Sequence, residues 1–308
     1  MPGSTSLNRV AALWDTGRAM SLDAQTLLDW FAETARDLPW RRPDCTAWGV
    51  LVSEIMLQQT PVARVEPIWR EWLRRWPTPS AMAAASQGEV LRAWGKLGYP
   101  RRALRLHAAA QAIAAEHGDV VPDDVDTLLA LPGIGAYTAR AVAAFAYGKR
   151  CPVVDTNVRR VVARAVHGAG DAGPPSTTRD LNDVAALLPR EDAAVFSAAL
   201  MELGALVCVA RTPRCADCPV LATCAWQRNG RPAYDGPAKA VQKFAGTDRQ
   251  VRGLLLDVLR GTPEPVGKAR LDAVWSDAGQ RDRCLHSLLV DGLVEQTATG
   301  LFALPGEH

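Results

Sequence analysis

Apolar residues in the first two-thirds of the chain recur at intervals of three and four positions, which is the spacing of one helix face. This part contains no alternation with period two, the pattern of a half-buried strand. The pattern therefore predicts an all-α fold. The expected helices cover residues 22–36, 49–59, 65–76, 86–94, 101–116, 123–129, 136–147, 156–166, 180–188 and 193–208.

The character of the chain changes after residue 230. Residues 231–249 are rich in Gly, Pro, Ala and Lys, which predicts a linker. Helical patterns then follow at 250–260, 271–275 and 282–291, and two short strand-like runs flank Ala298-Thr299-Gly300. Three helices and a hairpin resemble a small winged-helix-like domain, which we place at residues 250–308. At the other end, we expect the first twenty residues to be a lead-in before a helix capped by Ser21.

Charge and hydropathy narrow the class of protein. The 308 residues carry a net charge of +2, and no apolar run has the length of a membrane span. We therefore expect no membrane partner and a cytoplasmic, nucleoid-associated protein. Residues 36–105 contain twelve Lys and Arg against six Asp and Glu. Such an excess is typical of a phosphate-binding surface, and the alternative is a set of solvated helix faces.

Four of the seven cysteines lie in one short segment, and the other three are scattered. The four are Cys208, Cys215, Cys218 and Cys224, in the segment CVARTPRCADCPVLATC. Four thiolates in so short a loop can hold a structural zinc ion or an iron–sulfur cluster. Two disulfides are the alternative, which the absence of a recognisable secretion signal disfavours.

A glycine turn separates two of the expected helices. The segment LPGIG contains Gly133 and Gly135, which permit a sharp turn with positive φ where it is required. The helix that follows presents its first N–H groups and the positive end of its dipole. Such a turn can bind a DNA phosphate without reading base sequence, and an ordinary helix–helix turn is the alternative.

Two carboxylates stand in unusual settings. Glu54 lies inside an apolar helix, where burial raises a carboxyl pKa and favours a proton donor. Asp155 precedes an expected helix, and we predict that the helix dipole keeps it ionised. The alternative for Glu54 is a structural, ion-paired glutamate, and the alternative for Asp155 is a simple N-cap. One protonated and one ionised carboxyl group is the arrangement that cleaves a glycosidic bond.

Seven motifs together resemble one known superfamily, the endonuclease III superfamily of DNA glycosylases, and within it the MutY-type adenine glycosylases. The motifs are DLPWR (37–41), SEIMLQQT (53–60), GYPRRA (98–103), LPGIGAYTAR (131–140), VDTNVRRV (154–161), MELGALVC (201–208) and the four-cysteine loop. The resemblance implies a two-lobed helical glycosylase domain over 1–230, with DNA bound in the cleft between the lobes. It also implies a helix–hairpin–helix motif at 123–147 and a [4Fe–4S] cluster in the loop 208–224.

The resemblance assigns three residues to the chemistry. Asp155 would stabilise an oxocarbenium-like sugar, and Glu54 would protonate the departing adenine. Tyr137 stands where bifunctional members carry a catalytic lysine. Since a phenol cannot form a Schiff base, we expect little or no lyase activity.

The resemblance also implies contacts with double-stranded DNA that contains A·8-oxoguanine or A·G. The opposite-base and wedge residues would be Gln58, Gln59, Thr60 and Tyr99. The adenine pocket would contain Arg36, Leu38, Trp40, Arg41 and Glu202. The DNA backbone would meet Gly133, Gly135, Arg211 and Arg214. Like many single-site enzymes of this size, the chain is expected to be a monomer.

Two departures from the family pattern stand out. Pro100 occupies the position of the second aromatic residue that usually follows the wedge. The segment after residue 249 is also too short and too helical for the Nudix-like domain of many MutY-type proteins. The alternatives are a G·T mismatch thymine glycosylase of the same fold and a non-catalytic DNA-binding iron–sulfur protein.

Overall fold

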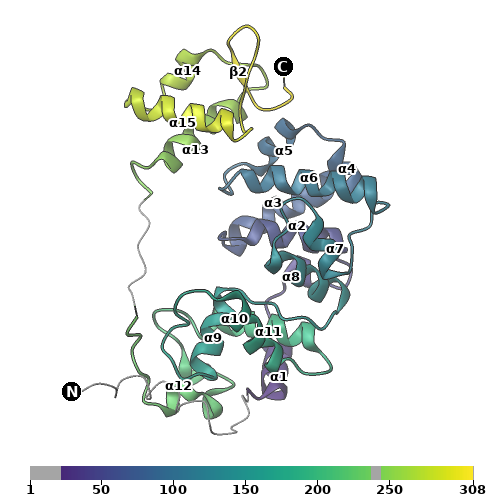
Figure 1. Ribbon diagram of the computed structural model, residues 1–308, viewed down its shortest axis with the longest axis vertical. Helices are drawn as coiled ribbons and strands as arrows, with labels where there is room; N and C mark the ends of the chain where they lie inside the picture. Colours follow the sequence, from purple (N-terminus) through teal and green to yellow (C-terminus); the bar gives the residue numbers. More distant parts are fainter. Residues whose placement is uncertain (1–21, 237–243, 308) are drawn as a thin grey trace, which may run out of the picture. The chain divides into compact units, whose positions relative to one another are not determined.

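The computed structural model describes residues 22–236 and 244–307, and the chain divides into two compact units (Figure 1). Of the described residues, the first unit combines 22–35 with 154–191 and 195–236. The second combines 36–153 and 192–194 with residues 244–307, the C-terminal segment. Ser21, the expected lead-in and part of the expected linker lie outside the described residues.

The first unit is helical. Its elements are α1 (Ala24–Thr34), α9 (Thr156–Ala165), α10 (Thr177–Leu187), most of α11 (Ala193–Leu206), the short helices η3 (Cys215–Asp217) and η4 (Leu221–Thr223), and α12 (Ala225–Arg228). Helix α1 begins at Ala24 because the Asp23 side chain accepts the N–H of Thr26 at 3.1 Å.

The second unit contains the remaining elements, and α2 lies at its centre. They are η2 (Pro39–Arg41), α2 (Ala47–Leu57), α3 (Val62–Arg75), α4 (Pro79–Ala83), α5 (Gln87–Trp94), α6 (Arg101–Glu116), α7 (Val125–Ala130), α8 (Ala136–Tyr147), α13 (Asp248–Arg260), α14 (Lys268–Asp272), α15 (Ala278–Val290), β1 (Glu295–Gln296) and β2 (Phe302–Ala303). Every residue of α2 from Trp48 to Met56 is buried, which agrees with its apolar sequence.

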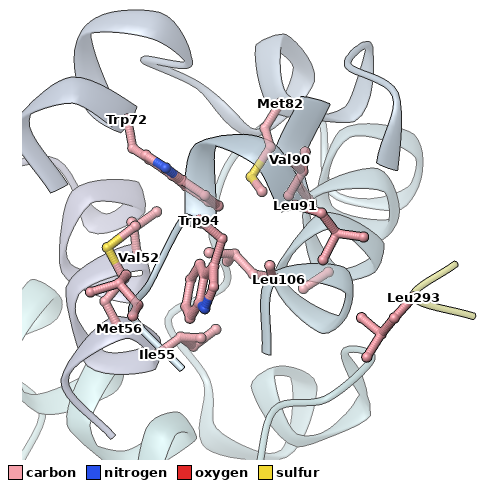
Figure 2. Close-up of a cluster of buried hydrophobic side chains, with 14 of the residues drawn as sticks. Val52, Ile55, Met56, Trp72, Met82, Val90, Leu91, Trp94, Leu106 and Leu293 are labelled. Carbon is pink, nitrogen blue, oxygen red and sulfur yellow. The ribbon is translucent and has the colours of Figure 1, made fainter. Parts of the chain in front are cut away.

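Tryptophans and aliphatic side chains build the core of this unit. Trp72 makes edge-to-face contacts with Trp76 and Trp94 at centroid distances of 5.0 and 5.5 Å. Figure 2 shows Trp72 and Trp94 near Ile55 and Met56 of α2. The same core includes residues of the C-terminal segment, such as Leu293 at its margin in Figure 2.

The C-terminal segment forms three helices and a hairpin in the expected order. Strands β1 and β2 pair antiparallel, and Val266 forms a bridge with Phe302. Two helices start earlier than the sequence pattern predicts. Helix α14 begins at Lys268 instead of residue 271, and α15, which Asp277 caps, begins at Ala278 instead of residue 282. The winged-helix-like assignment stays a prediction.

The predicted all-α fold is confirmed, since residues 22–236 as described contain helices and no strand. The sequence pattern missed α4, a single turn that Thr78 caps and Pro79 begins. No helix in the described parts of the chain is long and apolar enough to span a bilayer.

Candidate active site

Asp155 is the N-cap of α9. Its carboxylate accepts the N–H of Val158 at 2.7 Å and the side-chain amide of Asn157 at 2.8 Å. A side-chain oxygen at this position satisfies an N–H group that lacks a partner within the helix. Asp155 is therefore an N-cap, the same bonds fix the direction of its carboxylate, and its catalytic role stays a prediction.

The electrostatics of Asp155 differ from the sequence-based prediction. We expected the helix terminus to keep its pKa low, but burial raises the pKa of this carboxyl above its usual 3.8. The hydrogen bonds from Val158 and Asn157 act in the opposite direction and do not cancel the loss of hydration. The expectation of a low pKa was wrong because the sequence does not reveal how deeply an N-cap lies, and the ionised state of Asp155 stays a prediction.

A chain of hydrogen bonds links Asp155 to the cysteine loop. Asn157 donates to Asp155 and accepts from Arg160 Nη2 at 2.7 Å. Arg160 also donates to the carbonyls of Cys208 and Gly204, both at 2.6 Å. A Cβ added at Gly204 would lie 2.6 Å from Asn157 Cβ, so glycine permits the close approach of α11 and α9.

Glu54 lies in α2 and is 6% exposed. Helix α2 packs on α8, and Gln58 Nε2 donates to Thr138 Oγ1 of α8 at 3.3 Å. Tyr137, next to Thr138, is half-buried in the first turn of α8. The second unit therefore brings the Gln58 segment to the residue beside Tyr137.

Arg102 is a buried residue that donates several hydrogen bonds to the chain around the predicted opposite-base residues. Its guanidinium donates to five oxygens at 2.6–3.1 Å: the carbonyls of Ile55, Met56, Gln58 and Gly98, and Thr60 Oγ1. Three of these carbonyls lie at the C-terminal end of α2, where helix carbonyls lack intrahelical partners. Arg102 thus ties the end of α2 to the turn before α6.

Two exposed residues beside Arg102 have left-handed backbones. Gln59 has φ 55° and Tyr99 has φ 49°, and both were predicted to contact the estranged base or its neighbours. Such conformations cost about 1–3 kcal/mol in residues other than glycine and occur often at functional sites. Arg102 donates to the carbonyls on the N-terminal side of both residues, at Gln58 and Gly98.

The glycine turn joins α7 to α8, in the order expected for a helix–hairpin–helix motif. Gly133 has φ 73°, and a Cβ there would lie 2.5 Å from Arg105 Cβ. Gly135 instead is extended with φ −96°, and a Cβ there would meet open space. It is the N-cap of α8 and, as a glycine, has no side chain to accept a hydrogen bond from the helix. The exposed turn thus lies directly before the first N–H groups of α8.

The four clustered cysteines line one cavity in the first unit. All seven cysteines are free thiols, so the two-disulfide alternative is wrong. Four sulfurs around one zinc ion would lie about 3.8 Å apart, given a Zn–S distance of about 2.3 Å. Within residues 22–236 and 244–307, no group of three or more His, Cys, Asp or Glu is close enough to hold a single metal ion. Four free thiols around one cavity fit a thiolate-bound metal centre, and the kind of centre stays a prediction.

Arginines shape the cysteine loop. Buried Arg164 donates to the carbonyls of Val209 and Ala210 and to Cys208 Sγ, and it stacks on Trp226. Arg214 donates through its side chain to Leu206 at the end of α11, so it has a capping role besides the predicted phosphate contact. Arg211 is exposed.

The predicted adenine-pocket residues are distributed over both units. Leu38 and Trp40 belong to the core of the second unit, where Trp40 contacts Trp69 edge-to-face at 5.7 Å. Glu202 is fully buried in α11 of the first unit, and Arg36 and Arg41 are half-buried. Their roles toward adenine stay predictions.

Sequence reasoning missed three positioning residues, although each lies in a quoted motif. Asn157 and Arg160 follow Asp155 in VDTNVRRV, and Arg102 lies in GYPRRA. An Asn two positions after an N-cap Asp is a detectable signal for a local hydrogen bond. A buried arginine among exposed arginines gives no such signal.

Comparisons with known proteins indicate the family of the chain. A family model described as "HhH-GPD superfamily base excision DNA repair protein" matches residues 52–186. The adenine DNA glycosylase of Mycolicibacterium smegmatis is 68% identical over 290 residues, covering 94% of this chain and 98% of that protein.

Solved structures extend the comparison to the fold. A thermostable thymine-DNA glycosylase superposes with a TM-score of 0.62 at 26% identity, over 67% of this chain and 95% of that one. A trapped endonuclease III–DNA covalent intermediate gives a TM-score of 0.58 at 23% identity, over 69% of this chain and all of that one. The chain therefore belongs to the adenine DNA glycosylases of the HhH-GPD superfamily.

Proposed function

We propose that this chain removes adenine mispaired with 8-oxoguanine or guanine from double-stranded DNA, acts as a monomer and leaves the DNA strand uncut. The observation that carries the proposal is the oriented carboxylate of Asp155. Val158 and Asn157 hold both of its oxygens, so it cannot turn away from a substrate. A fixed negative charge of this kind stabilises the positive charge that develops on a sugar as its base departs.

Glu54 is the general acid of this proposal. Its carboxyl is buried in α2, most of whose residues are apolar, and Asp155 is oriented by hydrogen-bond donors. Protonation of adenine at N7 by Glu54 makes the base a neutral leaving group. The two carboxyl groups thus divide the reaction: one supplies the proton and the other stabilises the sugar.

Tyr137 supports the absence of strand cleavage. Cleavage by β-elimination requires an amine that attacks the sugar C1′ and forms a Schiff base. The side chain at this position of α8 is a phenol. The expected product is therefore an abasic site in an intact strand.

The cysteine loop would hold a [4Fe–4S] cluster through Cys208, Cys215, Cys218 and Cys224. The free thiols and the cavity that they line support this assignment. When bound, the cluster would supply four thiolate cross-links that shape the loop carrying Arg211 and Arg214.

Metal analysis tests the assignment: iron and acid-labile sulfide should occur in equal amounts. Cys218→Ser should reduce both, whereas Cys151→Ser, outside the loop, should not. Zinc without sulfide would refute it.

A single-turnover assay tests the proposed reaction. Duplexes with one central A·8-oxoguanine, A·G, T·G or A·T pair are incubated with excess protein, and base release is measured with and without alkaline cleavage of the product. Adenine release should be fastest opposite 8-oxoguanine and require alkali to cut the strand. Glu54→Gln should be strongly impaired, whereas Glu116→Gln, which removes an exposed carboxylate on α6, should match the parent.

One specific observation favours a second candidate. The structural similarity to a thymine-DNA glycosylase, at 26% identity, supports thymine as the base that is released. The 68% identity to an adenine DNA glycosylase outweighs it. Thymine release from T·G with no adenine release would reverse this order, and no release from any duplex would favour a non-catalytic DNA-binding protein.

A further inference from the structure

The C-terminal segment is fixed to the second unit by polar contacts on α5. Arg92 of α5 forms an ion pair with Glu307 and donates to the carbonyl of Leu259 at 3.2 Å. In return, Arg260 donates to the carbonyl of Leu91 at 3.1 Å. These side chains are mostly shielded from solvent, so the contacts hold α13 in one place relative to α5.

This docking brings the first turn of α13 to Tyr99, the predicted wedge. Arg249 Nη1 donates to Tyr99 Oη at 3.1 Å, and its guanidinium lies 5.8 Å from the Tyr99 ring centroid. The same guanidinium lies 5.1 Å from the ring of Phe244, which is 53% exposed. Arg249 therefore joins two exposed aromatic rings.

The charge of Arg249 remains available to a ligand. Its neighbour Asp248 is occupied by Arg283 and Gln280, and these contacts lower the pKa of Asp248 to about 2. Among the described residues, Arg249 has contacts with Tyr99 and Phe244 but no carboxylate partner. An unneutralised arginine beside exposed aromatic rings is typical of surfaces on which nucleic-acid bases stack.

Tyr99 is held on both sides. It is 42% exposed and strained at φ 49°, and Arg102 lies 5.4 Å from its ring centroid. Arg102 anchors the backbone of the turn through Gly98, whereas Arg249 holds the phenol. The ring therefore has one supporting cation from α6 and another from the C-terminal segment.

We propose that Arg249 is a positioning residue that holds Tyr99 ready to enter the DNA base stack, so that the C-terminal segment contributes to mispair recognition. This inference rests on the proposed function. It assigns a role to the C-terminal segment. Its effect is on recognition of the mispair and not on cleavage of the glycosidic bond, because Arg249 acts through Tyr99.

The test compares Arg249→Ala with Arg270→Ala, which removes the same charge from an exposed position on α14. Dissociation constants are measured for A·8-oxoguanine and A·T duplexes, and 2-aminopurine beside the mispair reports base unstacking by its fluorescence. We expect Arg249→Ala to weaken mispair binding about five- to tenfold and to reduce the fluorescence increase. Binding to A·T should fall only as much as with Arg270→Ala.

Three further variants separate positioning from other roles. Arg249→Lys keeps a cation and should recover part of the loss, and Tyr99→Phe should reproduce the part due to the hydroxyl. If Arg249 acts through Tyr99, Tyr99→Ala with Arg249→Ala should bind no more weakly than Tyr99→Ala alone. Equal weakening toward all duplexes, or additive losses, would show a direct phosphate contact and overturn the proposal.

Two controls keep the outcomes distinct. If urea unfolding of Arg249→Ala matches that of the parent, the C-terminal segment remains docked in this variant. If Arg249→Ala unfolds, Tyr99→Phe replaces it in the binding measurements. If the parent protein releases no adenine opposite 8-oxoguanine, the proposed function fails. If the parent is active and Arg249→Ala matches Arg270→Ala in every measurement, only the role of Arg249 fails.

Discussion

Replacing Arg102 by methionine should destabilise the protein by about 4 kcal/mol. Methionine fills a similar volume but donates no hydrogen bond, so five oxygens lose a partner. Hydrogen bonds from a charged donor contribute about 1.5 kcal/mol each at the low end, or roughly 7 kcal/mol in total.

The cost of burying the guanidinium offsets part of that sum. Burial lowers the pKa of Arg102 from 12.5 to about 10, which corresponds to about 3 kcal/mol of lost hydration. The remainder is about 4 kcal/mol. At neutral pH the group stays protonated, so the loss should not depend on pH between 6 and 8.

Urea unfolding followed by circular dichroism measures this loss. Arg105→Met, an exposed position on the same helix, is the matched control and should change stability by less than about 0.5 kcal/mol. Arg102→Lys should lie between the two, because an ammonium group cannot span five acceptors. A loss below about 1 kcal/mol for Arg102→Met would refute the reasoning, since it would mean that water satisfies these carbonyls equally well.

The remaining predictions concern the reaction and its support. Asp155→Asn should lower single-turnover base release by about 100-fold or more while duplex binding is retained, and equal rates would exclude Asp155 from catalysis. Because burial raises the pKa of Asp155 and the reaction needs its ionised form, the rate should fall with decreasing pH at a midpoint above 3.8. The same shift means that protonation of Asp155 favours folding as the pH falls toward 3.8. Tyr137→Lys should gain a borohydride-trapped adduct and some strand cleavage, and no adduct would show that this position does not reach the sugar. Gly204→Ala should displace Asn157 and slow base release more than it weakens duplex binding, which rate and affinity measurements on one duplex compare.

Local patterns predicted most helices because their apolar faces and caps are short-range signals. The glycine turn, the cysteine loop and the N-cap position of Asp155 were all found in this way. The boundaries of α14 and α15 were wrong by several residues, since polar first turns such as that of α15 carry no apolar periodicity. Helix α4 was missed because five residues are too few to show a period.

Effects that depend on packing were not accessible from the sequence. The raised pKa of Asp155 follows from depth of burial, which its neighbours in sequence do not determine. Arg102 and Arg249 acquire partners across 42–47 and 150 residues, respectively, and arginine patterns do not encode such contacts. The charge excess over residues 36–105 therefore combines exposed arginines with at least one that is structural.

The order of the two units along the chain has a consequence for synthesis on the ribosome. Helix α1 is made first, but its unit is completed only by residues 154–236. At about 5–20 residues per second, roughly ten seconds separate α1 from α9. During that interval residues 36–153 can fold. The apolar face of α1, which includes Leu27, fully buried in the finished protein, stays exposed until residues 154–236 are made. Nascent chains stopped shortly before residue 154 should therefore expose α1 to chaperones and proteases, although most of the second unit is already formed.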